Sequence, residues 1–181
     1  MVDRQKITPL GPDYNRRRRD RNVDIHPYFE RRVALVYYYP DMHPDIIDSL
    51  VDNGYRGIVI AGTGLGHVNK PVYPAIERAT GRGVAIYMTV QTLWGYTHMF
   101  VYDTGRDLMA KGVIPAANML PEVAYVKLGW ALGQTNDLDK VKDIMLTPIC
   151  GETTDREPYN GYLILQGGIP EVEEFLRKIH K

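Results

Sequence analysis

Hydrophobic residues along the chain form short apolar runs that alternate with segments of helical periodicity. Three runs are nearly continuous and apolar, as expected of strands buried on both faces: Val33–Tyr38, Gly57–Ala61 and Gly83–Thr89. Between them, Pro44–Gly54 and Val72–Thr80 have the pattern of helices, the first with apolar residues on one helical face. Alternation of strand and helix is typical of a parallel sheet whose strands are joined by helical crossovers.

The pattern continues beyond the third predicted strand with further helices. Asp103–Lys111 predicts a helix that ends at Gly112, and Val113–Pro115 predicts a short edge strand. Pro121–Gln134 and Leu138–Leu146 predict two more helices. The predicted fold class is α/β, a small open parallel sheet with helices on both faces.

The first residues of the chain lack any strand or helix period. Met1–Tyr28 contains three prolines, few large aliphatic residues and the arginine run Arg16–Arg19. Such a segment is typical of an arm or linker. The arginines are consistent with an RNA or partner contact, or with a solvated tether.

We therefore predict three parts. Residues 1–30 form a linker or arm, residues 31–147 an α/β domain, and residues 148–181 a C-terminal extension. Within the extension we expect an extended segment at Tyr162–Leu165 and an amphipathic helix at Pro170–Ile179.

Composition narrows the classes of function. Lys plus Arg and Asp plus Glu each number 22, so a zero net charge gives no general attraction to nucleic acid or anionic membranes. Cys150 is the one cysteine, which excludes an intramolecular disulfide and a zinc site of several thiolates, and we expect it to be partly buried. No apolar stretch is long enough to span a bilayer, and Met1–Leu10 lacks a signal-peptide core. We predict a cytoplasmic protein without membrane contact.

The first candidate site is the glycine-rich loop that follows the second predicted strand. In open parallel sheets, ligands bind beyond the carboxyl ends of strands, and Gly62–His67 leaves such an end. Its glycines are spaced too tightly for the dinucleotide-binding fingerprint. His67 could bond a carboxylate or an ammonium group of a ligand, or it could fix the loop by a hydrogen bond.

A second candidate region follows the third predicted strand. Thr89–Tyr102 is rich in hydrogen-bonding groups and in large aromatic residues. Trp94, Tyr96 and Phe100 could line a substrate pocket, or could cover the sheet end or a subunit interface. His98 has no carboxylate or second histidine at metal-ligand spacing, so no metal site is predicted.

Six stretches of the chain form an ordered set of motifs: Asn53–Val68, Gln91–Gly95, Val101–Leu108, Gly112–Pro115, Asn118–Met119 and Pro121–Leu128. In this order they resemble the C-terminal domain of the L-asparaginase family, whose fold is flavodoxin-like. The resemblance covers about residues 30 to 147. The loop form at Gly62–Val68 and the ending Gly151–Arg156 more closely resemble the family of archaeal D subunits of glutamyl-tRNA(Gln) amidotransferase.

The resemblance implies a role in substrate binding without catalysis by these residues alone. The family's nucleophile and base lie in N-domain motifs, Thr-Gly-Gly-Thr and Gly-Thr-Asp-Thr, which do not occur here, so we predict no catalytic residue and no activity for the chain by itself. No cofactor is implied. The implied substrate-binding residues are Thr63, Gly64, His67, Gln91 and Thr92.

Two positions depart from the family pattern. His67 stands where the secreted bacterial enzymes carry a substrate-binding asparagine, and Phe100 falls near the place of an acidic residue. Some bacterial relatives bind an effector asparagine near the segment that corresponds to Gln91–Thr97, which leaves a regulatory site as an alternative.

The resemblance also implies partners. They are an N-terminal asparaginase domain or subunit, a kinase-like amidotransferase subunit, further copies of the chain in a homo-oligomer, and tRNA only through the complex. The alternatives are a non-catalytic module that senses an amino acid or docks a partner, and a fragment without a function of its own.

Overall fold

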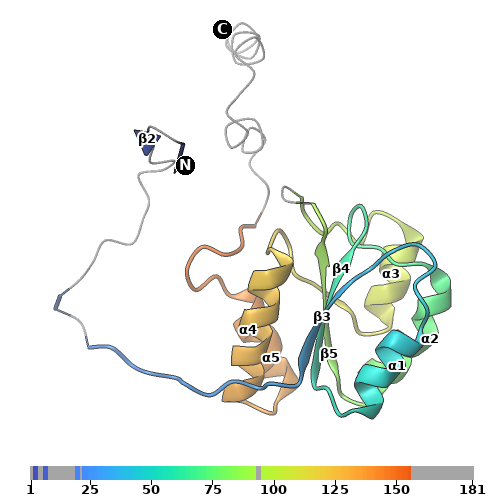
Figure 1. Ribbon diagram of the computed structural model, residues 1–181, viewed down its shortest axis with the longest axis horizontal. Helices are drawn as coiled ribbons and strands as arrows, with labels where there is room; N and C mark the ends of the chain where they lie inside the picture. The colour runs from blue at the N-terminus through green and yellow to red at the C-terminus, as the bar shows by residue number, and fades with distance from the viewer. Residues whose placement is uncertain (1, 4–5, 8–18, 21, 93–94, 156–181) are drawn as a thin grey trace, which may run out of the picture. The chain divides into compact units, whose positions relative to one another are not determined.

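The computed structural model describes residues 2–3, 6–7, 19–20, 22–92 and 95–155 (Figure 1). The chain divides into a compact unit, Pro27–Glu157, and a unit made of Met1–His26 and Pro158–Lys181. In the latter, strand β1 (Val2–Asp3) pairs antiparallel with β2 (Lys6–Ile7). The sequence pattern missed this pair because two residues are too few to show a period of two.

The compact unit is built on a parallel sheet of four strands. Their order in the sheet is β3-β4-β5-β6, the same as their order in the chain. The strands are β3 (Val33–Tyr37), β4 (Gly57–Gly62), β5 (Ala85–Val90) and β6 (Ile114–Pro115). The four strands predicted between Val33 and Pro115, including the short edge strand, are therefore confirmed. Their carboxyl ends meet at one edge of the sheet because all four run in the same direction.

Helices cover both faces of the sheet, as predicted (Figure 1). One face is covered by α1, η1, α2 and α3, and the other by α4 and α5. Within the described residues each predicted helix is present, and the one predicted to begin at Val72 begins at Tyr73, directly after a 3-10 turn. The bounds are α1 (Asp45–Asp52), η1 (Lys70–Val72), α2 (Tyr73–Gly81), α3 (Asp103–Ala110), α4 (Pro121–Gln134) and α5 (Leu138–Leu146).

Alternation along the central strands supplies both halves of the core. Ile58 and Ile60 of β4 point to the α1–α2 side, whereas Val59 between them points to the α4 side. In β5, Met88 and Tyr87 divide in the same way. Every residue of both strands is buried, which explains their nearly continuous apolar sequence.

The residues that lead into β3 pack against the backbone of α4. The amide of Glu30 donates to the carbonyl of Gly129 over 2.8 Å, and the Gln134 side chain donates to the carbonyl of Tyr28 over 2.7 Å. A Cβ at Gly133 would collide with that Tyr28 oxygen. The two glycines of α4 therefore allow the entering chain to approach the helix backbone.

Some sequence expectations differ from the structure or lie outside it. Cys150 is exposed rather than partly buried, because its segment lies on the surface beyond α5. Tyr162–Leu165 and Pro170–Ile179 lie outside the described residues, and the division at residues 30 and 147 stays a prediction. None of the described helices has both the length and the apolar character needed to cross a lipid bilayer.

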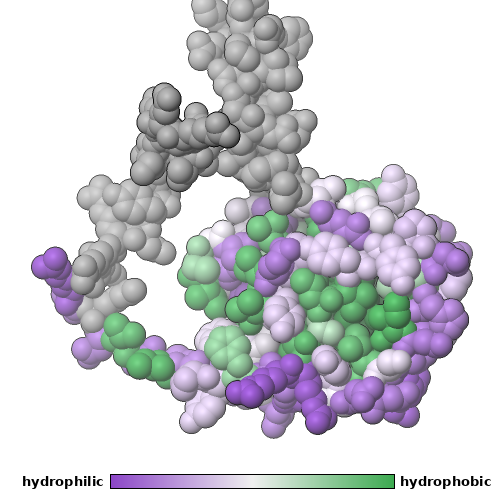
Figure 2. Space-filling model, viewed as in Figure 1, coloured by the Kyte–Doolittle hydropathy of each residue, from purple (hydrophilic) through white to green (hydrophobic). Residues whose placement is uncertain are grey.

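Apolar side chains also gather at one open edge of the sheet. Figure 2 shows them over β3, between α1 and α4. Ala34, Leu35 and Val36 are only half-buried there, and Tyr37 is 47% exposed.

Candidate functional site

The loop after β4 is a tight turn at the carboxyl edge of the sheet. Thr63 and His67 form an isolated antiparallel bridge, with both of their amides bonded across the turn at 3.0 and 2.9 Å. The Thr63 hydroxyl also donates to the His67 carbonyl. Gly64 and Gly66 have φ of 54° and 95°, which side chains rarely tolerate. The glycine spacing seen in the sequence is thus the spacing of this turn.

The tip of the turn presents free backbone donors. Thr63 and Gly64 are exposed, and among the described residues no hydrogen bond occupies the amide N–H of Gly64 or of Leu65. Two adjacent free amides at a glycine turn suit a carboxylate. The arrangement can therefore bind an acidic group without any charged side chain.

His67 lies behind this tip rather than on it. Its Nδ1 is 3.3 Å from the Thr104 hydroxyl oxygen, and its ring contacts Tyr102 edge-on at 5.6 Å. Burial lowers the pKa of His67, so the ring is neutral at neutral pH. Nε2 is buried and has no hydrogen-bond partner among the described residues. The ring therefore fixes the loop through Thr104 and leaves Nε2 as a buried nitrogen without a described partner.

The two other predicted substrate-binding residues follow β5. The Gln91 side-chain amide donates to the carbonyls of Tyr38 and Ala61, the latter over 2.9 Å. Gln91 thus ties together the ends of β3 and β4, which leaves its carbonyl oxygen as an acceptor. Thr92 is exposed. The substrate-binding role of Thr63, Gly64, His67, Gln91 and Thr92 stays a prediction.

The aromatic residues beyond β5 stack on one another along the surface. Tyr96 stacks on His98 at 4.7 Å, and His98 meets Phe100 edge-on at 5.7 Å. Trp94 lies outside the described residues. Beside this row is a cleft of about 250 Å³ at the end of β6, which Tyr96, Phe100, Met119 and Asp155 help to line.

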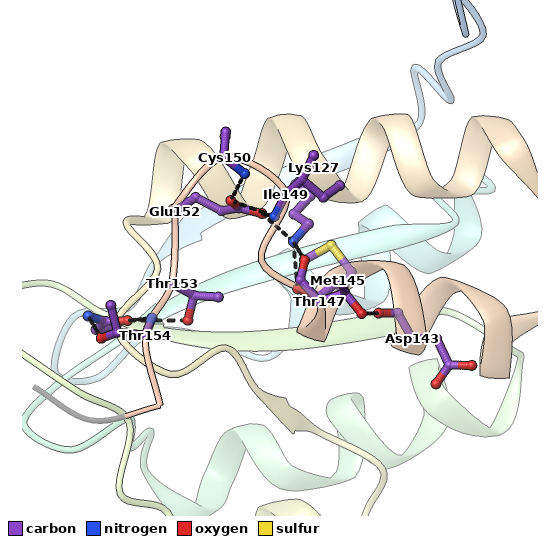
Figure 3. A network of polar contacts seen from close by, with 10 residues as sticks. Lys127, Asp143, Met145, Thr147, Ile149, Cys150, Glu152, Thr153 and Thr154 are labelled. Atoms are coloured by element: carbon purple, nitrogen blue, oxygen red, sulfur yellow. Dashed lines mark hydrogen bonds and ion pairs between the residues drawn. The ribbon is translucent and has the colours of Figure 1, made fainter. Parts of the chain in front are cut away.

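A buried ion pair, shown in Figure 3, joins α4 to the segment beyond α5. Lys127 and Glu152 lie 2.5 Å apart, with side chains only 7% and 5% exposed. Lys127 also donates to the carbonyls of Met145 and Thr147 over 3.0 and 2.7 Å. The pair therefore holds down the end of α5 as well as the following segment.

Glu152 accepts more hydrogen bonds than its partner lysine supplies. The amides of Ile149 and Cys150 donate to it over 3.0 and 2.8 Å. Burial alone would raise the pKa of Glu152, but these bonds and the one from Lys127 outweigh it and hold the pKa far below its usual range. The sequence pattern did not predict this pair; its one signal was a lysine within the apolar run of α4.

A second tie lies next to it. The Asn118 side chain donates to the Thr154 hydroxyl over 2.8 Å and accepts from the Thr154 amide over 2.9 Å. The Thr153 hydroxyl donates to the same amide oxygen of Asn118. Thr153 and Thr154 thus pack against the loop after β6.

In the part of the chain that the structure describes, no three His, Cys, Asp or Glu side chains gather as a metal site would require. The donors around the glycine turn are neutral amides, hydroxyls and one neutral imidazole, and such a set binds a polar amino acid better than a metal ion.

In a comparison with known protein families, residues 32–145 match the glutaminase/asparaginase C-terminal domain. The chain belongs to this family. The asparaginase C-terminal domain found here is also similar to the D subunit of archaeal glutamyl-tRNA(Gln) amidotransferases. Identity is 51% over 159 residues for Pyrococcus furiosus, which is 88% of this chain and 36% of the relative. For Metallosphaera sedula it is 52% over 150 residues, 83% of this chain and 34% of the relative.

Solved structures agree with this assignment. The thermostable L-asparaginase from Thermococcus kodakarensis superposes with a TM-score of 0.65 at 32% identity, over 71% of this chain and 39% of that one. L-asparaginase I from Vibrio cholerae gives a TM-score of 0.67 at 26% identity, over 75% and 41%. The chain thus spans little more than a third of the curated relatives it matches.

Proposed function

We propose that this asparaginase C-terminal domain works within an amidohydrolase subunit that releases ammonia from asparagine or glutamine. The observation that carries the proposal is identity of about half to amidotransferase D subunits over 88% of the chain. The ammonia would pass to a kinase-like subunit that activates glutamyl-tRNA(Gln). Contact with tRNA would occur only through that complex.

The proposed contribution of the domain is to hold the substrate. The free amides of Gly64 and Leu65 would bind the carboxylate of the substrate amino acid, next to the exposed Thr63 hydroxyl. His67 would hold the turn in place through the contact of Nδ1 with Thr104, and Nε2, which has no partner among the described residues, would bond the substrate. Thr92 and the carbonyl oxygen of Gln91 would accept from the substrate's amino or amide group.

The proposed chemistry needs groups that these residues do not carry. Amide hydrolysis in this family proceeds by attack of an activated threonine hydroxyl. The two motifs that carry the catalytic groups, Thr-Gly-Gly-Thr and Gly-Thr-Asp-Thr, do not occur in the 181 residues. An asparaginase N-domain would therefore supply nucleophile and base, whether it lies on the same polypeptide or on another. Substrate contacts alone cannot lower the barrier for the attack.

The test is ammonia release from asparagine and glutamine by the chain alone and after addition of a separately produced asparaginase N-domain. We expect no turnover alone and turnover in the mixture. In the active mixture, Thr63→Val should raise KM about tenfold or more, whereas Lys142→Glu on the exposed side of α5 should leave KM unchanged. Ammonia release by the pure chain would contradict the proposal that an N-domain supplies the nucleophile and the base.

The cleft beside Tyr96 favours a second candidate function, a module that senses an amino acid without hydrolysing it. Its 250 Å³ is small for a drug-sized ligand but sufficient for a free amino acid. Calorimetry with asparagine, glutamine and aspartate tests this candidate. Saturable heat that Tyr96→Ala abolishes supports it, and absence of heat with all three removes it.

A further inference from the structure

The strand β3 forms an open edge of the sheet. It is the terminal strand in the order β3-β4-β5-β6, and no described strand pairs with its outer side. Its sequence, Val-Ala-Leu-Val-Tyr, is wholly apolar apart from one hydroxyl. On α1, Ile46 and Leu50 are also only half-buried. An open apolar edge of this kind is a template for pairing with another strand.

The backbone of β3 has hydrogen-bonding groups available at that edge. The Arg32 carbonyl accepts from β4 at Gly57, and the Tyr38 amide donates to Ala61 of β4. Alternate residues between them therefore face β4, and Val33, Leu35 and Tyr37 turn their N–H and C=O groups outward. Three outward residues give a regular ladder for an incoming strand.

The other edge of the sheet is unsuited to the same role. Strand β6 has only two residues, and one of them is Pro115, which has no amide N–H to donate. Short strands and prolines are devices that block pairing at an edge. The contrast singles out β3.

Charge at the two ends of β3 indicates what pairs with it. Exposed Arg31 and Arg32 precede the strand. At its other end, the exposed carboxylate of Glu122 on α4 accepts from the Tyr37 hydroxyl over 2.7 Å. One end of the edge is thus basic and the other acidic. A second copy of the same edge that runs in the opposite direction would place its acidic end beside the basic end of the first.

We propose that β3 pairs antiparallel with β3 of a second copy of this chain, about a two-fold axis at Leu35. Val33 then lies opposite Tyr37 of the second copy. Arg31 lies diagonally from that same Tyr37, on the face of the sheet where Glu122 sits. The two sheets join into one that is continuous across the dimer, and each two-fold interface contains the Arg31–Glu122 contact twice.

The test uses charge reversal with the full chain and analytical ultracentrifugation over the micromolar range. Arg31→Glu alone sets two carboxylates against each other at both contacts, and Glu122→Arg alone sets two guanidinium groups against each other. We expect each variant to raise the dimer Kd at least tenfold. An equimolar mixture of the two should form a heterodimer with a Kd near that of the unchanged chain. In this heterodimer one contact joins Arg31 to Glu122, as in the unchanged chain. The other contact joins the new glutamate at position 31 to the new arginine at position 122.

Lys142→Glu, a reversal on α5, is the matched control and should leave the Kd unchanged. Circular dichroism of each variant checks that the fold is retained. The doubly reversed chain, with Arg31→Glu and Glu122→Arg together, should dimerise with a Kd near that of the unchanged chain. The proposal is overturned if the unchanged chain stays monomeric, if the single reversals leave the dimer intact, or if the double reversal does not restore it. In those cases another occupant, such as an asparaginase N-domain, covers β3.

Discussion

At the residue scale, the buried pair of Lys127 and Glu152 fixes the end of α5 and the following segment against α4. Glu152→Gln would leave the Lys127 ammonium 7% exposed with only carbonyl partners. Breaking a buried pair in this way costs about 3 to 5 kcal/mol of unfolding free energy. Urea unfolding at pH 7 measures the loss. Glu77→Gln, in the exposed pair with Lys111, should cost under about 1 kcal/mol.

The same pair predicts a pH dependence. Because the folded pKa of Glu152 lies below its unfolded value of about 4.3, its stabilisation is present above that pH and is lost as pH falls. The difference in stability between the unchanged chain and Glu152→Gln should therefore be constant at neutral pH and shrink below about pH 4. A difference that does not depend on pH would show that Glu152 is not ionised in the fold.

Single residues also mark where sequence reasoning stopped. The turn at Gly62–His67 could be predicted because glycine spacing reports backbone conformation directly. The bonds of Gln91 to the carbonyls of Tyr38 and Ala61 could not, since both partners are backbone atoms of other strands. For Lys127 the sequence shows a charge in an apolar helix, but not that Glu152 returns to meet it.

At the scale of elements, Gly133 of α4 is an exception to the rule that alanine stabilises a helix more than glycine does. Gly133→Ala should gain helix propensity of about 1 kcal/mol, yet its Cβ would collide with the Tyr28 carbonyl. We expect a net destabilisation, because the chain around Tyr28 must move away from α4. Gly81→Ala in α2 is the control: nothing lies within 4 Å of its Cβ, so it should stabilise by about 0.5 to 1 kcal/mol. Thermal unfolding of the two variants should shift in opposite directions.

The helix α5 depends on the residue that caps its start. The Asp137 carboxylate accepts from the amides of Asp139 and Lys140 over 3.0 and 3.4 Å. Asp137→Ala should cost about 1 kcal/mol in chemical denaturation, and Asp137→Ser should recover most of it. Equal stability of the Ala and Ser variants would contradict the capping role.

Elements were the scale that the sequence predicted best. α4 and α5 begin and end at the predicted residues, and four parallel strands were expected. Long apolar periods and prolines at helix starts carry this information locally. The pair β1–β2 was missed because its strands are two residues long.

At the scale of the whole molecule, the family could be predicted from ordered motifs over residues 30 to 147, and the match over residues 32–145 confirms it. The substrate-binding residues stay predictions because their ligand would also contact groups outside these residues. Reconstitution with an N-domain is therefore the measurement that reaches this scale.

The order of the strands has a consequence for synthesis on the ribosome. β3, β4, β5 and β6 emerge in their spatial order, and the helices that connect them cover the same side of the sheet. The opposite side, with Tyr87 at its centre, stays bare until α4 leaves the exit tunnel. The nascent chain thus passes through an interval with a half-covered sheet, and this interval is when chaperones would be needed most.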